Sequence, residues 1–356
     1  MPKINSYTNW GRLEEVWLGD CYPAHFYDHL DAEVRDVFYE ITEKTQTDLT
    51  IIQKKLEEFG VIVQRPHYSN IENYLKYHDK SGPDLVKPEI CPRDNYLVAG
   101  NNLIGSDMYN VWGHALKEYS ADSESHLIEI VSGQHIGKIT GANSVRAGRD
   151  IYLDIFYSHD KNSGMDKMLL EFQNLYAKLF QDYRVHILFN GGHIDGCFAA
   201  ISPGVLLTSK YFTQYDLTFP QWKMINIHAP EFMHHRTLKS IRPPMDAKKW
   251  WETGSAHSLA FNNHIIKYAK DWVGDYTETY FEVNCLVIDE KNVLMLGENE
   301  SVFRELEKHG ITAHSLPFRT RTFWDGGLHC LTLDIRRQDS MVDLFPDRSR
   351  SLYLYS

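Results

Sequence analysis

The sequence predicts a mixed α/β fold built from a repeated unit, in which a β-hairpin is followed by a helix and one further strand. Three observations predict it: helical periodicity in separated segments, a strand-like segment directly after each of them, and paired strand-like segments joined by turn residues. Strands joined by hairpins argue against a doubly wound parallel sheet. No linker rich in Pro, Gly or Ser divides the 356 residues, so we expect a single domain over residues 1–356.

The clearest helix is predicted over residues 32–59. Its apolar residues recur at spacings of three and four, Asp31 is suited to the N-cap, and Gly60 is suited to the C-terminal stop. A short strand over residues 61–64 follows at once. Two further helix–strand pairs are predicted, over residues 166–182 and 184–189 and over residues 301–309 and 311–316.

Two hairpins are predicted from paired apolar segments. Residues 198–201 and 205–208 flank Ser202-Pro203-Gly204, which is typical of a tight turn. Residues 285–288 and 293–296 flank a polar tetrapeptide in the same way. The order of hairpin, helix and strand therefore recurs along the chain without obvious sequence identity between the copies.

The composition, with 43% hydrophobic and 24% charged residues, is that of a soluble globular protein. A formal net charge of −11 gives no support to a nucleic-acid partner. The first ten residues lack the apolar core of a signal peptide, and no stretch reaches the roughly 18 apolar residues of a membrane span. We therefore expect a cytoplasmic protein with neither a nucleic-acid nor a membrane partner.

The cysteine and histidine spacings argue against disulfides and metals. The five cysteines are scattered, with no CxxC pair, which argues against a disulfide framework and a structural zinc site. His228, His234 and His235 lack the helical i, i+4 spacing of a zinc site and have no carboxylate motif nearby. We therefore expect no metal.

Cys330 is the first candidate for chemistry. It closes the run Gly326-Gly327-Leu328-His329-Cys330 and precedes an alternating segment, which predicts a position at the start of a strand where a side chain can reach a cleft. A buried structural cysteine is the alternative.

His193 and Asp195 supply a titratable imidazole and a carboxylate. We expect them in an extended stretch, where residues two apart point to the same side, and the neighbouring glycines leave room for a ligand. A hydrogen-bonded structural pair is the alternative. Asp94 follows Cys91-Pro92-Arg93 and is expected at the entrance to a strand.

Taken together, these motifs resemble the amidinotransferase family, which belongs to the arginine deiminase superfamily. The matching segments are residues 6–19, 91–94, 145–150, 183–186, 193–195 and 202–207, and the closing Gly-Gly-Leu-His-Cys run with Asp334-Ile335-Arg336-Arg337. They occur in the family's order across nearly the whole chain. The resemblance implies a five-bladed α/β propeller with a site on its central axis, no cofactor, and a homodimer as the assembly.

The resemblance also implies roles for the matching residues. Cys330 would be the nucleophile and His193 the general acid/base, while Asp94 and Asp195 would bind a guanidinium, with Arg93 beside them in the substrate site. A thiolate attacks a guanidinium carbon better than water does, and His193 would protonate the departing amine. The guanidino donor would leave its amidino group on Cys330. An amine acceptor would then take this group from the cysteine.

Two positions near the catalytic histidine depart from the family pattern. The family carries an acidic residue that pairs with this histidine, and the aligned position is Thr140. A second Asp becomes Asn143. A histidine without a carboxylate partner is expected to be less basic and less firmly oriented.

Two further departures concern substrate recognition. Phe212, with Lys210 nearby, stands where relatives usually place an Arg for the donor's α-carboxylate, and Glu282 replaces a small hydroxyl residue. Our hypothesis is that one substrate is an amine or lacks an α-carboxylate. The alternative is an alignment slip, with Lys210 or Arg319 binding the carboxylate instead.

Three functions remain open from the sequence. The first is amidino transfer in specialised biosynthesis. The second is guanidine hydrolysis, because water in place of the acceptor gives deiminase or dihydrolase chemistry from the same cysteine. The third is a binding or partner subunit whose activity has decayed, against which the retention of Cys330, His193, Asp94 and Asp195 speaks.

Overall fold

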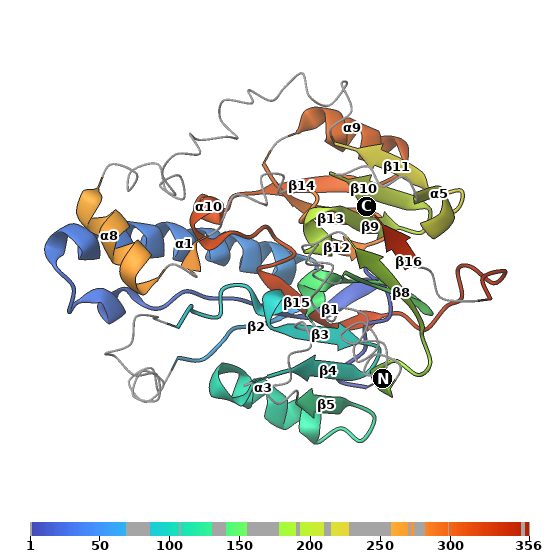
Figure 1. The fold of residues 1–356 in the computed structure, drawn as a ribbon, viewed down its shortest axis with the longest axis horizontal. Coiled ribbons are helices and arrows are strands. Elements are labelled where there is room, and N and C mark those ends of the chain that lie inside the picture. The colour runs from blue at the N-terminus through green and yellow to red at the C-terminus, as the bar shows by residue number, and fades with distance from the viewer. Residues whose placement is uncertain are drawn as a thin grey trace, which may run out of the picture.

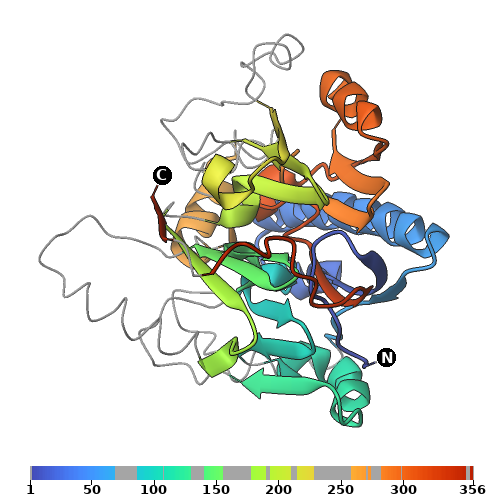
Figure 2. The ribbon, with the colours of Figure 1, turned by 90° about the vertical axis from the view of Figure 1, so that its right-hand side faces the viewer.

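In the described part of the chain, five small sheets of three or four strands surround a common centre (Figures 1 and 2). The computed structural model describes residues 2–68, 86–106, 108–129, 140–154, 178–189, 193–209, 215–227, 258–269, 272–273, 282–297, 299–349 and 353–355. Figure 2 shows the sheets fanned around the middle of the molecule. The arrangement confirms the predicted five-bladed α/β propeller. Within the same residues, no helix is long and apolar enough to cross a membrane.

Every sheet repeats one connectivity, in which an antiparallel pair of strands is extended by a parallel strand. The strands, listed by sheet, are β15 (Thr332–Gln338), β1 (Arg12–Leu18) and β2 (Ile62–Gln64); β3 (Tyr96–Ala99), β4 (Asn102–Gly105) and β5 (His126–Glu129); β6 (Ser144–Ala147), β7 (Asp150–Asp154), β8 (Arg184–Phe189) and β16 (Tyr353–Tyr355); β9 (Phe198–Ser202), β10 (Val205–Thr208) and β11 (Lys223–Asn226); and β12 (Leu286–Asp289), β13 (Asn292–Leu296) and β14 (Thr312–Leu316). The two predicted hairpins are confirmed as β9–β10 and β12–β13.

Helices occupy the connection that leads to the parallel strand. They are α1 (Ala32–Glu58) before β2, α3 (Tyr109–Ser120) before β5, α5 (Tyr215–Thr218) before β11 and α9 (Glu300–Lys308) before β14. Figure 1 shows α3 and α9 at opposite edges of the molecule. Two more, α8 (Leu259–Tyr268) and α10 (Arg321–Trp324), lie outside this pattern, and α8 packs against α1. The predicted helix over residues 166–182 lies almost wholly outside the described residues.

Helix α1 forms where the periodicity predicts it. Its buried residues include Phe38, Ile41 and Leu49, which pack into the largest apolar cluster. Asp31 occupies the N-cap position, although its side chain makes no capping hydrogen bond. Gly60 has a φ of 79° directly after the helix, a conformation that glycine adopts without strain.

The first and last parts of the chain share one sheet. β1 pairs antiparallel with β15, with Arg12 opposite Gln338 and Leu18 opposite Thr332. Because β1 also pairs with β2, it lies at the centre of this sheet and closes the ring. The strand that follows Cys330 is therefore held by residues more than 300 positions earlier in the chain.

A buried ionic cluster lies at the centre of the ring and consists of Asp334, Arg93, Arg146 and Arg337. Asp334, which is 1% exposed, accepts hydrogen bonds from Arg93, from Arg146 and, at 2.8 Å, from Nε of Arg337. Burial alone would raise the pKa of Asp334, but the three guanidinium groups hold it well below its usual range.

The arginines of this cluster also bind backbone carbonyls from several sheets. Arg146 donates to the carbonyl of Val98 on β3 at 2.9 Å, and Arg337 donates to Val287 on β12 at the same distance. Each of these carbonyls belongs to a sheet other than that of the arginine itself. The cluster therefore joins neighbouring blades through charge-assisted hydrogen bonds.

Asp334→Asn is expected to lower the free energy of unfolding by about 3–5 kcal/mol, because three buried guanidinium groups lose their shared carboxylate. Chemical denaturation followed by circular dichroism measures the change. Asp36→Asn is the matched control, since the exposed Asp36–Arg35 pair is worth about 0–1 kcal/mol. A loss of stability for Asp334→Asn no larger than that of the control would contradict the prediction.

Candidate active site

The candidate site is formed by five short turns, each of which directly precedes the first strand of a sheet. Three of them are 3-10 helices: η2 (Pro92–Asp94) before β3, η3 (Gly141–Asn143) before β6 and η4 (Ile194–Gly196) before β9. The other two are residues 282–284 before β12 and residues 327–331 before β15. η2 contacts η3, η3 contacts η4, and β15 contacts η2, so the turns adjoin one another around the centre.

Each turn contributes one polar or nucleophilic side chain at a corresponding place. The five are Asp94, Asn143, Asp195, Asn284 and Cys330. The repeated blade explains why residues so far apart in sequence meet, because each lies shortly before the strand that its turn precedes.

Cys330 is buried and held by Asn284. The side-chain amide of Asn284 donates to Sγ at 2.9 Å, while its oxygen accepts from the backbone nitrogen of Cys330 at 3.0 Å. Gly327 permits this arrangement, since a Cβ there would lie 2.7 Å from Oδ1 of Asn284. A donor aimed at sulfur stabilises a thiolate more than a thiol.

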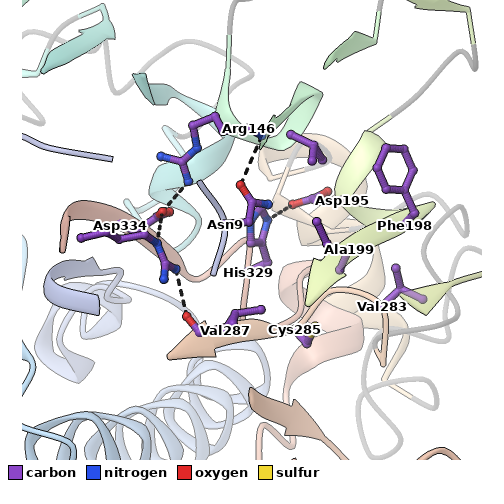
Figure 3. A pocket seen from close by; sticks show the side chains of 13 residues that line it. Asn9, Arg146, Asp195, Phe198, Ala199, Val283, Cys285, Val287, His329 and Asp334 are labelled. Carbon is purple, nitrogen blue, oxygen red and sulfur yellow. Dashed lines mark hydrogen bonds and ion pairs between the residues drawn. The ribbon is translucent and has the colours of Figure 1, made fainter. Parts of the chain in front are cut away.

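Asp195 lies between Cys330 and His329. Its Oδ2 is 3.5 Å from Sγ of Cys330. The same oxygen is 2.8 Å from Nδ1 of His329, a contact that Figure 3 shows. Burial and the nearby guanidinium of Arg93 hold the pKa of His329 well below its usual range. The imidazole is therefore neutral, and Nδ1 carries the proton because a carboxylate can only accept.

His193 lies on the more open side of η4. Its side chain is 39% exposed, and Nδ1 is 3.9 Å from Oδ1 of Asp94. This oxygen of Asp94 is buried and makes no hydrogen bond within the described residues. Asp94 is thus the carboxylate that faces His193, while Thr140 occupies the N-cap position of η3 and is buried.

The expectation that His193 and Asp195 share an extended stretch is wrong. Only His193 has extended backbone, with φ −70° and ψ 123°, and Asp195 lies inside η4. The turn separates the two side chains, so that His193 is partly exposed whereas Asp195 is 3% exposed.

The remaining predicted site residues lie in varied surroundings. Arg93 is buried, where it donates to Asp334 and to the carbonyls of His329 and Thr332. Oδ1 of Asn143 is buried and makes no hydrogen bond within the described residues.

Two charged candidates, Glu282 and Arg319, lie in different surroundings. Glu282 is partly buried and lies two residues before Asn284 in the turn. Arg319 binds Asp48 of α1 at 2.9 Å and is half exposed. Lys210, Phe212 and the histidines at 228, 234 and 235 lie outside the described residues.

Two residues of the site were not predicted as functional. Asn284 could have been found by aligning the segments that precede the predicted strands. Like Asp94 and Cys330, it lies two residues before a strand. His329 has no sequence signal of its own beyond its position before Cys330.

The described residues contain no group of three or more His, Cys, Asp or Glu side chains that could hold a metal ion. None of the five cysteines, all of which are described, forms a disulfide. The described part of the site offers a thiol, two histidines and two carboxylates.

Curated proteins similar to this chain are named as amidinotransferases. No protein-family model matches it. Glycine amidinotransferase of Xenopus laevis is 25% identical, with 96% of this chain and 85% of the relative covered. L-arginine:L-lysine amidinotransferase of Pseudomonas savastanoi pv. phaseolicola is 24% identical, with 95% of each covered. Over nearly its whole length, the chain is thus similar to amidinotransferases.

Solved amidinotransferase structures share the fold of this chain. The amidinotransferase of the saxitoxin biosynthetic pathway from Microseira wollei has a TM-score of 0.67 at 20% identity. The match covers 96% of this chain and 100% of that protein's chain. Inosamine-phosphate amidinotransferase from Streptomyces griseus has a TM-score of 0.64 at 18% identity, covering 96% and 99%. The likeness to these structures confirms the predicted propeller fold.

Asn284→Asp is expected to slow alkylation of Cys330 by iodoacetamide at neutral pH by roughly tenfold to a hundredfold, because an N–H donor to sulfur is replaced by a negative charge. Mass spectrometry of the Cys330 peptide over a range of pH measures the rate. Asn101→Asp, in the β3–β4 turn, is the control and should react like the wild type. Unchanged alkylation in a folded Asn284→Asp enzyme would show that this contact does not activate the thiol.

Proposed function

We propose that the enzyme transfers an amidino group from a guanidino donor to an amine acceptor through a covalent intermediate on Cys330. The observation that carries this proposal is the environment of Sγ, which has an amide donor at 2.9 Å and a carboxylate oxygen at 3.5 Å. A nucleophile beside a buried anion is suited to a cationic substrate, and amidino transfer is the activity named for the relatives.

In the first step, Asp195 and Asp94 accept hydrogen bonds from the planar guanidinium of the donor. The cation offsets the negative charge beside sulfur, so that the thiol can pass its proton to His193. The thiolate attacks the guanidinium carbon and forms a C–S bond. The C–N bond to the donor's amine then breaks, and His193 returns the proton to that amine.

In the second step, the acceptor amine replaces the departed amine. His193 removes a proton from the acceptor nitrogen, which attacks the amidino carbon. The C–S bond breaks and the thiolate leaves. Asp94, 3.9 Å from Nδ1 of His193, orients the imidazole and stabilises its protonated form.

Donor recognition follows from the charges near the turns. Glu282 adds an anion two residues from Asn284, whereas the guanidinium of Arg319 is bound to Asp48. This supports a substrate that carries an amine, or lacks an α-carboxylate, on the side of Glu282.

Incubation with the correct guanidine and no acceptor is expected to add the mass of one amidino group to the intact protein. Mass spectrometry detects the adduct, which is lost in Cys330→Ala and retained in the matched variant Cys21→Ala. An acceptor amine should discharge the adduct and become amidinated. Release of ammonia or urea without an acceptor would indicate hydrolysis, and an unmodified protein with every guanidine would refute the covalent intermediate.

Agmatine is expected to be a better donor than arginine, because it lacks the α-carboxylate. Glu282→Gln should reduce this preference by about tenfold, the effect of one charge-assisted hydrogen bond. Comparison of kcat/KM for the two donors tests both statements. A clear preference for arginine would refute the assignment of the donor while leaving the transfer reaction intact.

A further inference from the structure

We infer that His329 is a positioning residue, which holds the carboxylate of Asp195 against Cys330. The inference rests on the proposed function of Cys330. It assigns the second histidine of the site a role distinct from the acid/base role of His193.

The position of His329 is fixed through its backbone and its side chain. Its carbonyl accepts from Nε of Arg93 at 2.8 Å, and its backbone nitrogen donates to the carbonyl of Asn284 at 3.3 Å. With the main chain held on both sides, the imidazole donates to Oδ2 of Asp195 at 2.8 Å. The same oxygen lies 3.5 Å from Sγ, so the imidazole determines where the carboxylate meets the nucleophile.

The arginine cluster keeps this donor neutral. Burial comes first among the causes that lower the pKa of His329, followed by the positive charges of Arg93, Arg146 and Arg337, while Asp334 opposes them. A protonated imidazole would form an ion pair with Asp195 and cancel the charge that a guanidinium needs. The neutral imidazole orients Asp195 without neutralising it.

The space around the pair leaves little room for another donor. Asp195, His329, Arg146 and Asp334 line a cavity of about 10 Å³, close to the minimum for one water molecule (Figure 3). This space admits no more than about one water molecule beside the imidazole. If the donor is removed, the carboxylate stays buried and becomes easier to protonate.

His329→Leu is expected to lower kcat/KM by roughly tenfold to a hundredfold and to move its acid limb to higher pH, because the ionised form of Asp195 loses a hydrogen bond. His329→Asn, whose amide can donate from a position close to that of Nδ1, should restore most of the loss and return the acid limb toward that of the wild type. The pH dependence of kcat/KM for all three proteins measures these effects.

His186→Leu is the matched control, because His186 and Asp150 form a second buried pair, with Nε2 2.5 Å from Oδ1, between β8 and β7. It should reduce stability without moving the acid limb. An unshifted acid limb in a folded His329→Leu enzyme, or a failure of His329→Asn to rescue, would overturn the inference. Amidination of wild-type Cys330, followed in parallel, separates this result from a failure of the proposed function, which would leave the wild type unmodified.

Discussion

The interaction on which the rest of the structure depends is the shared binding of Asp334 by Arg93, Arg146 and Arg337. Three buried cations can coexist because one carboxylate lies between them and because carbonyls from neighbouring blades accept their remaining hydrogen bonds. The cluster joins the blades into a ring and also leaves an excess of positive charge at the centre. The same cluster therefore determines both how the blades are joined and the charge at the centre of the ring.

That excess of charge acts on the site in a defined order. Burial, reinforced by the arginines, lowers the pKa of His329, His329 orients Asp195, and Asp195 contacts the sulfur of Cys330. On the open side, Asp94 faces His193. The two histidines thus differ because one is buried beside cations whereas the other is partly exposed beside an anion. Identical side chains acquire separate roles from their surroundings.

Local sequence patterns predicted the helices and hairpins. The contacts between side chains of the site depend instead on how the blades meet when the ring closes. Helix α1 and the hairpins β9–β10 and β12–β13 could be read from periodicity and turn residues, since they depend on neighbours in sequence. The contact of Asn284 with Cys330 spans 46 positions and exists only because two blades adjoin. The prediction that His193 and Asp195 point to the same side failed because it assumed a strand. Residues two apart point to the same side in a strand but not in the turn η4.

The pairing of β1 with β15 has a consequence for the order of events during synthesis. β1 emerges from the ribosome among the first strands, but its antiparallel partner follows more than 300 residues later. The thiol of Cys330 emerges just before that partner, so a nascent chain carries four incomplete polar turns and no assembled nucleophile. A chain that ends before Cys330 therefore lacks both this thiol and the strand that closes the ring, although it carries the other four polar turns.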